Sequence, residues 1–349
     1  MKKKQVRMLK VTCCVLGVIL AFALAITVYA EYLLSQMHYV NPDFAAPSLS
    51  QEEIYEILNG QKETEDPDYT GPYTDEEDVE LGTAGVEIGT EESIVNILLI
   101  GADYQETDRP RSDTAMLVTI NKENNTVTMT SFMRDLYVKI PGYAKNKLNA
   151  AYSLGGMLLL EETLLQNFGV HVDGIVEVDF RQFEKIIDLL GGIDLELTSQ
   201  EADWINKKNG SKLQSGMQHL NGQEAMWYSR NRTSNGGGDY NRTNRQRIVL
   251  MTLIETYKSA KLTTIVTMLD DILPMITTNM TRKQIVDYVV DLFPLLADAE
   301  IVSQRIPVGD GASLSTGHLM TKVNEMSVLV PNIELNVQYL LDTIGSKED

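Results

Sequence analysis

The chain has very little cysteine and histidine, and these shortages exclude several kinds of site. Its two cysteines, Cys13 and Cys14, are adjacent in an apolar N-terminal stretch, so the remainder has no thiol for a disulfide framework or a thiolate metal site. The four histidines show no metal-ligand spacing and are interpreted as structural or incidental. The sequence also shows no Ser-His or Cys-His arrangement of the kind used in nucleophilic catalysis.

Positive charge is scarce as well. The 349 residues include 30 Lys and Arg against 49 Asp and Glu, for a formal charge of −19. Most of the excess lies between Asn41 and Ser93, where sixteen acidic residues face only Lys62. The remainder is close to neutral and lacks the broad positive footprint of a nucleic-acid-binding protein, so nucleic acid is excluded as a partner.

The longest stretch without any charge is Val11 to Ala30, twenty residues that could cross a hydrocarbon core of about 30 Å as a helix. Lysines and an arginine precede it, which predicts an N-terminus inside the cell and a chain that is extracellular after Glu31. A cleaved signal peptide is the alternative, because Val28-Tyr-Ala30 resembles a cleavage site. We favour the membrane anchor.

Composition then predicts the organisation of the chain. We expect a cytoplasmic tail (1–10), a transmembrane anchor (11–30), an acidic extracellular linker (31–93), a main domain (94–260) and a helical continuation packed on that domain (261–349). Strands are predicted at 95–100, 115–121, 126–132, 174–180, 193–197 and 301–307, and helices at 148–168, 181–190, 221–229, 240–259, 264–276, 282–296 and 333–344. Because strands and helices interleave, the predicted fold is α/β, a central mixed β-sheet covered by helices on both faces.

Five arginines within eighteen residues form the most informative feature: Arg230, Arg232, Arg242, Arg245 and Arg247. Arginine clusters usually bind phosphate or carboxylate groups. If Asp239 opens a helix, Arg242 and Gln246 share its face and Arg245 lies on the flank. The alternative is a solvated basic face on which Asp239 is an ordinary N-cap.

Two carboxylates and another arginine follow predicted strands. Asp103 ends the first strand and Asp113 comes ten residues later, and such a pair could share Mg²⁺ with water and phosphate oxygens. Alternatively, Asp103 caps a turn and Asp113 pairs with Arg109 or Arg111. Arg134 follows the third strand, where Asp135 could orient it or form a surface salt bridge with it. Positioned arginines and carboxylates without a covalent nucleophile fit phosphoryl transfer.

Six motifs occur in order between about Asn96 and Tyr257: N-I-L-L-I-G-A-D, R-S-D-T, M-R-D-x-Y-V-x-I-P-G, K-L-N-A-A-Y, V-D-F-x-x-F-x-x-I-I-D-x-L-G-G-I and Y-S-R-N-R followed by D-x-x-R-x-x-R-Q. Together they resemble the LytR–CpsA–Psr family. The resemblance implies a membrane-anchored enzyme on the outer face of a Gram-positive cell. Such an enzyme transfers an anionic glycopolymer, of teichoic acid or capsule type, from a polyprenyl-pyrophosphate carrier onto peptidoglycan.

The resemblance also implies roles for particular residues. Asp103 and Asp113 match the family's Mg²⁺ ligands, and its pyrophosphate-binding set corresponds to Arg111, Arg134, Arg230, Arg232, Arg242 and Gln246, beside which we place Arg245. We expect Arg134, Asp239 and Arg242 to be catalytic, with Asp239 either a general base or a group that orients Arg242. The apolar face from Leu154 to Leu164 is either plain core or a wall of the prenyl-binding tunnel.

Other functions remain open from the sequence. The same cluster could serve a non-catalytic protein that binds polyprenyl phosphate or glycan, or a pyrophosphate hydrolase in which water replaces the acceptor hydroxyl. A transcriptional attenuator is a further possibility. However, the predicted cytoplasmic tail of about ten residues is too short to recognise a DNA groove.

Overall fold

The computed structural model describes residues 38–42, 49–59, 81–104, 110–232, 238–261, 264–265, 268, 271–323 and 326–345. The predicted membrane anchor at 11–30 and much of the predicted acidic linker lie outside these residues. Within the described ranges, no helix has the length and apolar character needed to cross a membrane.

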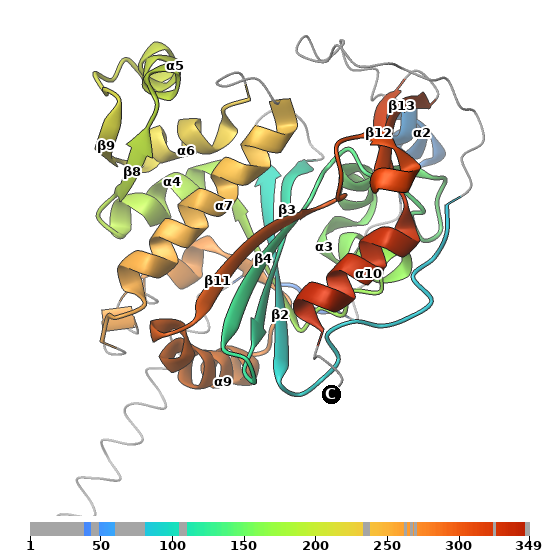
Figure 1. The fold of residues 1–349 in the computed structure, drawn as a ribbon, viewed down its shortest axis with the longest axis horizontal. Helices are drawn as coiled ribbons and strands as arrows, with labels where there is room; N and C mark the ends of the chain where they lie inside the picture. The colour runs from blue at the N-terminus through green and yellow to red at the C-terminus, as the bar shows by residue number, and fades with distance from the viewer. Residues whose placement is uncertain are drawn as a thin grey trace, which may run out of the picture.

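A seven-stranded sheet forms the centre of the molecule (Figure 1). Its strands, in spatial order, are β1 (His38–Tyr39), β10 (Thr277–Thr278), β7 (Gly174–Asp179), β2 (Ile94–Asp103), β3 (Arg111–Asn121), β4 (Thr126–Phe132) and β11 (Glu300–Ile306). β2, β3 and β4 form an antiparallel meander, while β7 pairs with β2 and β11 pairs with β4 in parallel. The predicted central mixed sheet is confirmed.

Helices cover both faces of this sheet (Figure 1). α3 (Leu148–Phe168) and α10 (Ile333–Ile344) lie on one side and share the main hydrophobic core with the strands. The other side carries α4 (Phe180–Leu189), α6 (Gly222–Arg230) and α7 (Gly238–Tyr257), with α5 (Ser199–Asn209) and the hairpin of β8 (Ile193–Leu197) and β9 (Gly216–Leu220) further out. These outer elements have a second, smaller core.

The remaining elements lie around these layers. They are α2 (Gln51–Asn59), β5 (Tyr137–Val138), β6 (Asn146–Lys147), η1 (Leu273–Met275), α9 (Arg282–Leu292), η2 (Phe293–Ala297), β12 (Ala312–Ser313), η3 (Leu314–Thr316), β13 (His318–Val323) and β14 (Met326–Pro331).

α4 and α6 approach each other closely because a glycine starts α6. A Cβ at Gly222 would lie 2.0 Å from the backbone oxygen of Glu184 in α4, so no larger residue fits there. Both helices begin with capping boxes, from Asp179 for α4 and from Asn221 for α6. The close approach fixes the C-terminal end of α6 over the start of α4, where the arginine cluster begins.

The C-terminal part differs from the predicted helical continuation. β11 joins the central sheet, as the predicted strand at 301–307 requires, but β12, β13 and β14 then form a separate three-stranded antiparallel sheet. The strand predicted at 193–197 is present as β8, but it pairs with β9 in a two-stranded sheet. The strands β12, β13 and β14 pair with close neighbours in the sequence, and helical periodicity does not predict such strands.

α3 is interrupted where the sequence places two glycines. Gly155 and Gly156 leave helical geometry, and Gly156 has a φ of 67°. On either side of the interruption, the apolar face that could form a lipid-binding wall is buried in the main core, through Leu154, Met157, Leu160 and Leu164.

The small C-terminal sheet is joined to the start of α7 through a buried histidine. His318 lies 2.7 Å from the backbone oxygen of Val308 through Nδ1, so Nδ1 carries the proton and donates. Its Nε2 lies 2.7 Å from the hydroxyl of Tyr240 and accepts from it. Tyr240 follows Asp239 directly, so this contact steadies the first turn of α7.

This contact predicts a pH-dependent stability. Burial lowers the pKa of His318 from its ordinary 6.5, outweighing the hydrogen bond to Val308, which raises it. Below about pH 6.5 the unfolded chain therefore binds a proton that the native state does not. The free energy of unfolding thus decreases as the pH is lowered through this range. We expect urea unfolding at pH 5.5 to show this loss relative to pH 7.5. A His318→Gln variant should lose this component, and an unchanged pH slope in that variant would contradict the assignment.

Candidate active site

Asp113 is brought into the site by an irregularity in β3. Gly101 of β2 pairs with Thr114, whereas the next residue, Ala102, pairs with Ser112. Asp113 is therefore an extra residue on the β3 side, as in a β-bulge. Such bulges redirect a side chain and often occur beside active sites.

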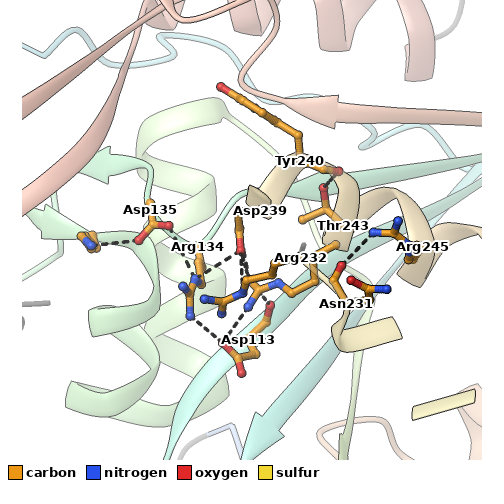
Figure 2. Close-up of polar contacts among 11 residues, drawn as sticks. Asp113, Arg134, Asp135, Asn231, Arg232, Asp239, Tyr240, Thr243 and Arg245 are labelled. Carbon is orange, nitrogen blue, oxygen red and sulfur yellow. Dashed lines mark hydrogen bonds and ion pairs between the residues drawn. The ribbon is translucent and has the colours of Figure 1, made fainter. Parts of the chain in front are cut away.

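Two arginines from distant parts of the chain meet on the Asp113 carboxylate (Figure 2). Arg134 Nη1 lies 2.9 Å and Arg242 Nη1 lies 3.3 Å from its Oδ1. Arg242 Nη2 also donates to the backbone oxygen of Asp113 at 3.2 Å. Burial raises the pKa of Asp113, but Arg242 and Arg134 outweigh it and lower the pKa to about 2. Asp113 is therefore an anion at physiological pH.

Asp239 is the second anion of the cluster and lies in the first turn of α7. Its Oδ1 is 2.9 Å from Arg242 Nη2, 3.6 Å from Arg232 Nε and 3.7 Å from Arg134 Nε. Figure 2 shows the side chains of Arg134 and Arg232 gathered between Asp239 and Asp113. Because Asp239 contacts three arginines, it is placed to orient their guanidinium groups. This is one of the two roles predicted for Asp239.

Asp135 contacts Arg134 and also forms a buried ion pair with Lys147. Arg134 Nε lies 3.5 Å from Asp135, whose Oδ1 is 2.9 Å from Lys147 Nζ. The Lys147 side chain is only 1% exposed. Burial raises the pKa of Asp135, but Arg134 and Lys147 outweigh it and lower the pKa below its ordinary value. The predicted Arg134–Asp135 contact is thus present, and it is mostly buried rather than a surface salt bridge.

Arg230 is placed by the end of α6 and the start of α4. Its guanidinium lies 4.4 Å from the centre of the Phe180 ring, and its Nη2 lies 3.7 Å from Asp103 Oδ2. Stacking on an aromatic face holds the charge without neutralising it. Arg230 therefore links the carboxylate at the end of β2 to the arginine cluster.

Part of this charged cluster borders a pocket of about 360 Å³. Its lining residues are Asp113, Phe180, Trp204, Lys208, Trp227, Arg230, Arg232, Arg242 and Gln246. Gln246 follows Arg242 by one helical turn, and its Oε1 is buried without a hydrogen-bond partner in the described part of the protein. Burial lowers the pKa of Arg232, and the nearby Arg242 and Arg134 lower it further. The pocket is therefore a crowded positive site suited to an anion.

The structure does not bring Arg111 and Arg245 into this pocket. Arg111 begins β3 and faces Asp103 in the strand register. Arg245 is buried and turned toward α5, where its Nε lies 2.8 Å from Glu201 Oε1 and its Nη1 donates to the backbone oxygen of Asn231 at 2.8 Å. For Arg245 this corrects the predicted role in pyrophosphate binding, because both contacts tie α7 to the neighbouring helices.

A stability effect follows for Arg245. Glu201 also completes the capping box of α5, with its Oε2 accepting from Thr198. Replacing Arg245 with methionine leaves this buried carboxylate without its cation, which should lower the free energy of unfolding by about 3–5 kcal/mol. Denaturant unfolding of Arg245→Met measures the change. A variant as stable as the wild type would show that the pair has no structural role.

Two carboxylates could hold a divalent cation here. Among the described residues, no group of three or more His, Cys, Asp or Glu side chains could hold a metal ion. Asp103 and Asp113 come from adjacent strands, and the hydrogen bonds to the Asp113 carboxylate use Oδ1, which leaves Oδ2 for a ligand. A pair of carboxylates beside an anion site fits Mg²⁺, which completes its shell with water and phosphate oxygens.

The aromatic side of the pocket was not predicted from the sequence. Phe180, Trp204 and Trp227 line it together with Lys208. Phe180 belongs to the V-D-F motif, and Trp204 and Trp227 are the only tryptophans of the chain. The scarcity of tryptophan was the available signal. However, Phe180, Trp204 and Trp227 come from three different helices, and their spacing in the sequence does not connect them.

Comparison with known proteins shows a family relationship. The model of the LytR_cpsA_psr family matches residues 54–333. The regulatory protein MsrR of Staphylococcus aureus is 40% identical over 161 residues, which is 46% of this chain and 48% of that protein. The chain thus aligns with about half the length of this relative. The polyisoprenyl-teichoic acid–peptidoglycan teichoic acid transferase TagU of Bacillus mycoides is 33% identical over 229 residues, 64% of this chain and 71% of that protein.

Solved structures agree with this relationship. Bacillus subtilis TagT, in a structure with bound octaprenyl pyrophosphate lipid, superimposes with a TM-score of 0.55 and 26% identity, covering 73% of this chain and 92% of that one. Bacillus subtilis TagV superimposes with a TM-score of 0.59 and 28% identity, covering 72% of this chain and 98% of that one. With a family model that spans most of the sequence and a mixed α/β fold that matches solved members, the chain belongs to the LytR–CpsA–Psr family.

Proposed function

We propose that the protein transfers an anionic glycopolymer, linked through phosphate, from a polyprenyl-pyrophosphate carrier onto peptidoglycan. The observation that carries the proposal is the convergence of Arg134 and Arg242 on Asp113, next to a pocket that also contains Arg230 and Arg232. A relative named as a teichoic acid transferase and a similar structure with bound octaprenyl pyrophosphate support this substrate class.

The charges of the site suit a pyrophosphate. Four guanidinium groups, of Arg134, Arg230, Arg232 and Arg242, alternate with the carboxylates of Asp103, Asp113 and Asp239. One positive charge is left over, whereas a pyrophosphate diester has a negative charge on each phosphate. A bound divalent cation would offset the net negative charge that remains and leave the loaded site with one positive charge. This supports Mg²⁺, held by Asp103 and Asp113, as the cofactor.

The reaction proceeds by substitution at phosphorus. A hydroxyl of the peptidoglycan acceptor attacks the phosphate joined to the sugar, and the bond to the bridging oxygen of the pyrophosphate breaks. The polyprenyl phosphate leaves with that oxygen, and the proton of the hydroxyl passes to solvent or to the leaving phosphate. Arg134, Arg230 and Arg242 stabilise the charge that builds up on the phosphate oxygens. Mg²⁺ would supply further charge neutralisation at the leaving group.

Preorganisation is the main contribution of the carboxylates. Asp239 and Asp113 fix the orientation of the guanidinium groups before the substrate binds, which avoids reorganisation during the reaction. For this reason we assign Asp239 the role of orienting Arg242 rather than that of a base. The predicted anchor at 11–30 would keep the pocket outside the cell near the membrane that carries the lipid-linked donor.

A product analysis tests the proposal against its alternatives. Full-length protein in detergent is given a polyprenyl-pyrophosphate-linked glycan, with and without peptidoglycan fragments, in Mg²⁺ or in EDTA. We expect glycan phosphate on the peptidoglycan together with released polyprenyl phosphate, and loss of both in EDTA. Equal release of polyprenyl phosphate without acceptor would instead identify a hydrolase. Binding without any release would identify a non-catalytic lipid-binding protein.

A further inference from the structure

The K-L-N-A-A-Y motif of the sequence has no role in the proposed reaction so far. It begins at Lys147 and forms the first turns of α3, which are interrupted at Gly155 and Gly156. Because these two glycines leave helical geometry, the first turns have a direction that the rest of α3 does not set. Apolar residues of the segment 147–153 belong to the main core, but its polar groups contact the strand ends that carry the site.

The first of these contacts is at the end of β2. Tyr104 directly follows Asp103, and its hydroxyl donates to Glu177 Oε1 of β7 at 2.6 Å. The hydroxyl of Tyr152 lies 3.1 Å from that of Tyr104. Because Tyr104 already donates its proton to Glu177, Tyr152 is the donor in this second hydrogen bond. Tyr152 and Glu177 are only 5% and 6% exposed, so they hold the residue next to Asp103 from two sides.

The second contact is at the start of β3. The hydroxyl of Ser153 donates to the backbone oxygen of Pro110 at 3.1 Å. Pro110 directly precedes β3 and lies shortly before Asp113 in the chain. Adjacent residues of one helix, Tyr152 and Ser153, thus contact the chain just after one candidate Mg²⁺ ligand and just before the other.

The third contact is with the chain that follows β4. The backbone N–H of Asn149 donates to the backbone oxygen of Arg134 at 3.2 Å. Lys147 Nζ lies 2.9 Å from Asp135 Oδ1, as described above. The segment 147–153 therefore contacts the backbone of Arg134 as well as the neighbours of the two carboxylates.

We propose that Tyr152 is a positioning residue of the transfer reaction, a role that rests on the proposed function. It sets the place of Asp103 through the hydroxyl of Tyr104, while Ser153 does the same for the strand that carries Asp113. A helix start that served only for packing would need no hydroxyl at position 152, because phenylalanine fills the same space. Preorganised groups must be held in place before the substrate binds, and buried hydrogen bonds from a rigid helix do this.

Removal of one hydroxyl tests the role of Tyr152. Tyr152→Phe keeps the ring, and we expect it to lower kcat for glycan transfer about tenfold, because a displacement of about 1 Å can cost about 100-fold. Binding of bare polyprenyl pyrophosphate, measured by calorimetry on the full-length protein, should remain unchanged. Its ligands Arg230 and Arg242 belong to α6 and α7 and keep their places. A lower kcat with unchanged binding is a split that a general loss of stability does not produce.

Hydrogen exchange gives a second readout that does not depend on turnover. Amides at the end of β2 and at the start of β3 should exchange faster in Tyr152→Phe than in the wild type, because that end of the sheet loses a support. Ser153→Ala should speed exchange at the start of β3 and lower kcat in the same direction. Glu177→Gln keeps an oxygen that accepts from Tyr104, so it should restore most of the transfer that is lost in Glu177→Leu.

Tyr257→Phe is the matched control. It also removes a tyrosine hydroxyl with a hydrogen bond, which is made to the backbone oxygen of Leu190. Tyr257 ends α7, at the opposite end of this helix from Asp239, and does not line the pocket. The variant should lose a comparable amount of stability and keep both the kcat of the wild type and its exchange at the ends of β2 and β3.

The outcomes distinguish this inference from the proposed function. If the wild type transfers glycan and Tyr152→Phe keeps its kcat, or lowers kcat and lipid binding together, Tyr152 does not position the site and the proposed function stands. Equal losses of kcat in Tyr152→Phe and Tyr257→Phe would also overturn the inference. If the wild type transfers no glycan, the proposed function is wrong and the inference falls with it.

Discussion

Replacing Asp113 with asparagine is expected to reduce glycan transfer by at least about 100-fold, the typical effect of losing one preorganised electrostatic group. The carboxylate is the common partner of Arg134 and Arg242 and one of two candidate Mg²⁺ ligands. Without it the two guanidinium groups keep only Asp239 as a shared anion and lose part of their orientation. Release of polyprenyl phosphate from the lipid-linked donor measures the effect.

The same substitution should also reduce stability. Arg242 is only 2% exposed but keeps Asp239 as a partner, so losing Asp113 should cost less than the about 3–5 kcal/mol expected for a buried charge left without any partner. Added inorganic pyrophosphate should restore part of the lost stability to Asp113→Asn, because an anion replaces the missing charge. Thermal unfolding with and without pyrophosphate tests this. Wild-type turnover in a well-folded Asp113→Asn protein would refute the role of Asp113.

Replacing Arg230 with alanine should reduce transfer by a similar factor, about 100-fold, with little change in stability. The side chain is 32% exposed, and its contacts are a ring face and an ion pair at 3.7 Å. Such contacts contribute about 1 kcal/mol or less each at a partly exposed site. Loss of activity would therefore come from the missing guanidinium in the pocket and not from unfolding.

A neighbouring arginine provides the control for this prediction. Arg181 lies one residue beyond Phe180 on α4, is exposed and does not line the pocket. Arg181→Ala removes the same charge from the same region and should keep wild-type turnover. If Arg230→Ala and Arg181→Ala behave alike, the effect is one of overall charge, and the assignment of Arg230 to the pyrophosphate fails.

Much of the local structure could be predicted from the sequence. β4 and α3 begin and end where the sequence patterns place them. The face shared by Asp239, Arg242 and Gln246 was also predictable, since positions three and four apart on a helix lie on one side. These features depend on nearest neighbours along the chain, so periodicity and composition contain the necessary information.

Arg245 shows where the same reasoning failed. Its position three residues after Arg242 suggested that it joins the cluster, but its side chain turns to Glu201 on α5. Glu201 is 44 residues away in the chain, and the packing of α5 against α6 and α7 places it there. Periodicity assigns a residue to a face of a helix, but it does not say which neighbour that face will meet.

By itself, the sequence determined the α/β class, the succession of strands and helices in the main domain, and an arginine-rich helix beside two acidic loop and strand positions. Only the tertiary structure decided that Arg134 and Arg242 share one carboxylate, because a bulge in β3 turns Asp113 toward them. It also brought Phe180, Trp204 and Trp227 from three helices to one wall. Such contacts depend on strand register and helix packing, which arise from interactions across the whole chain, so no local pattern in the sequence contains them.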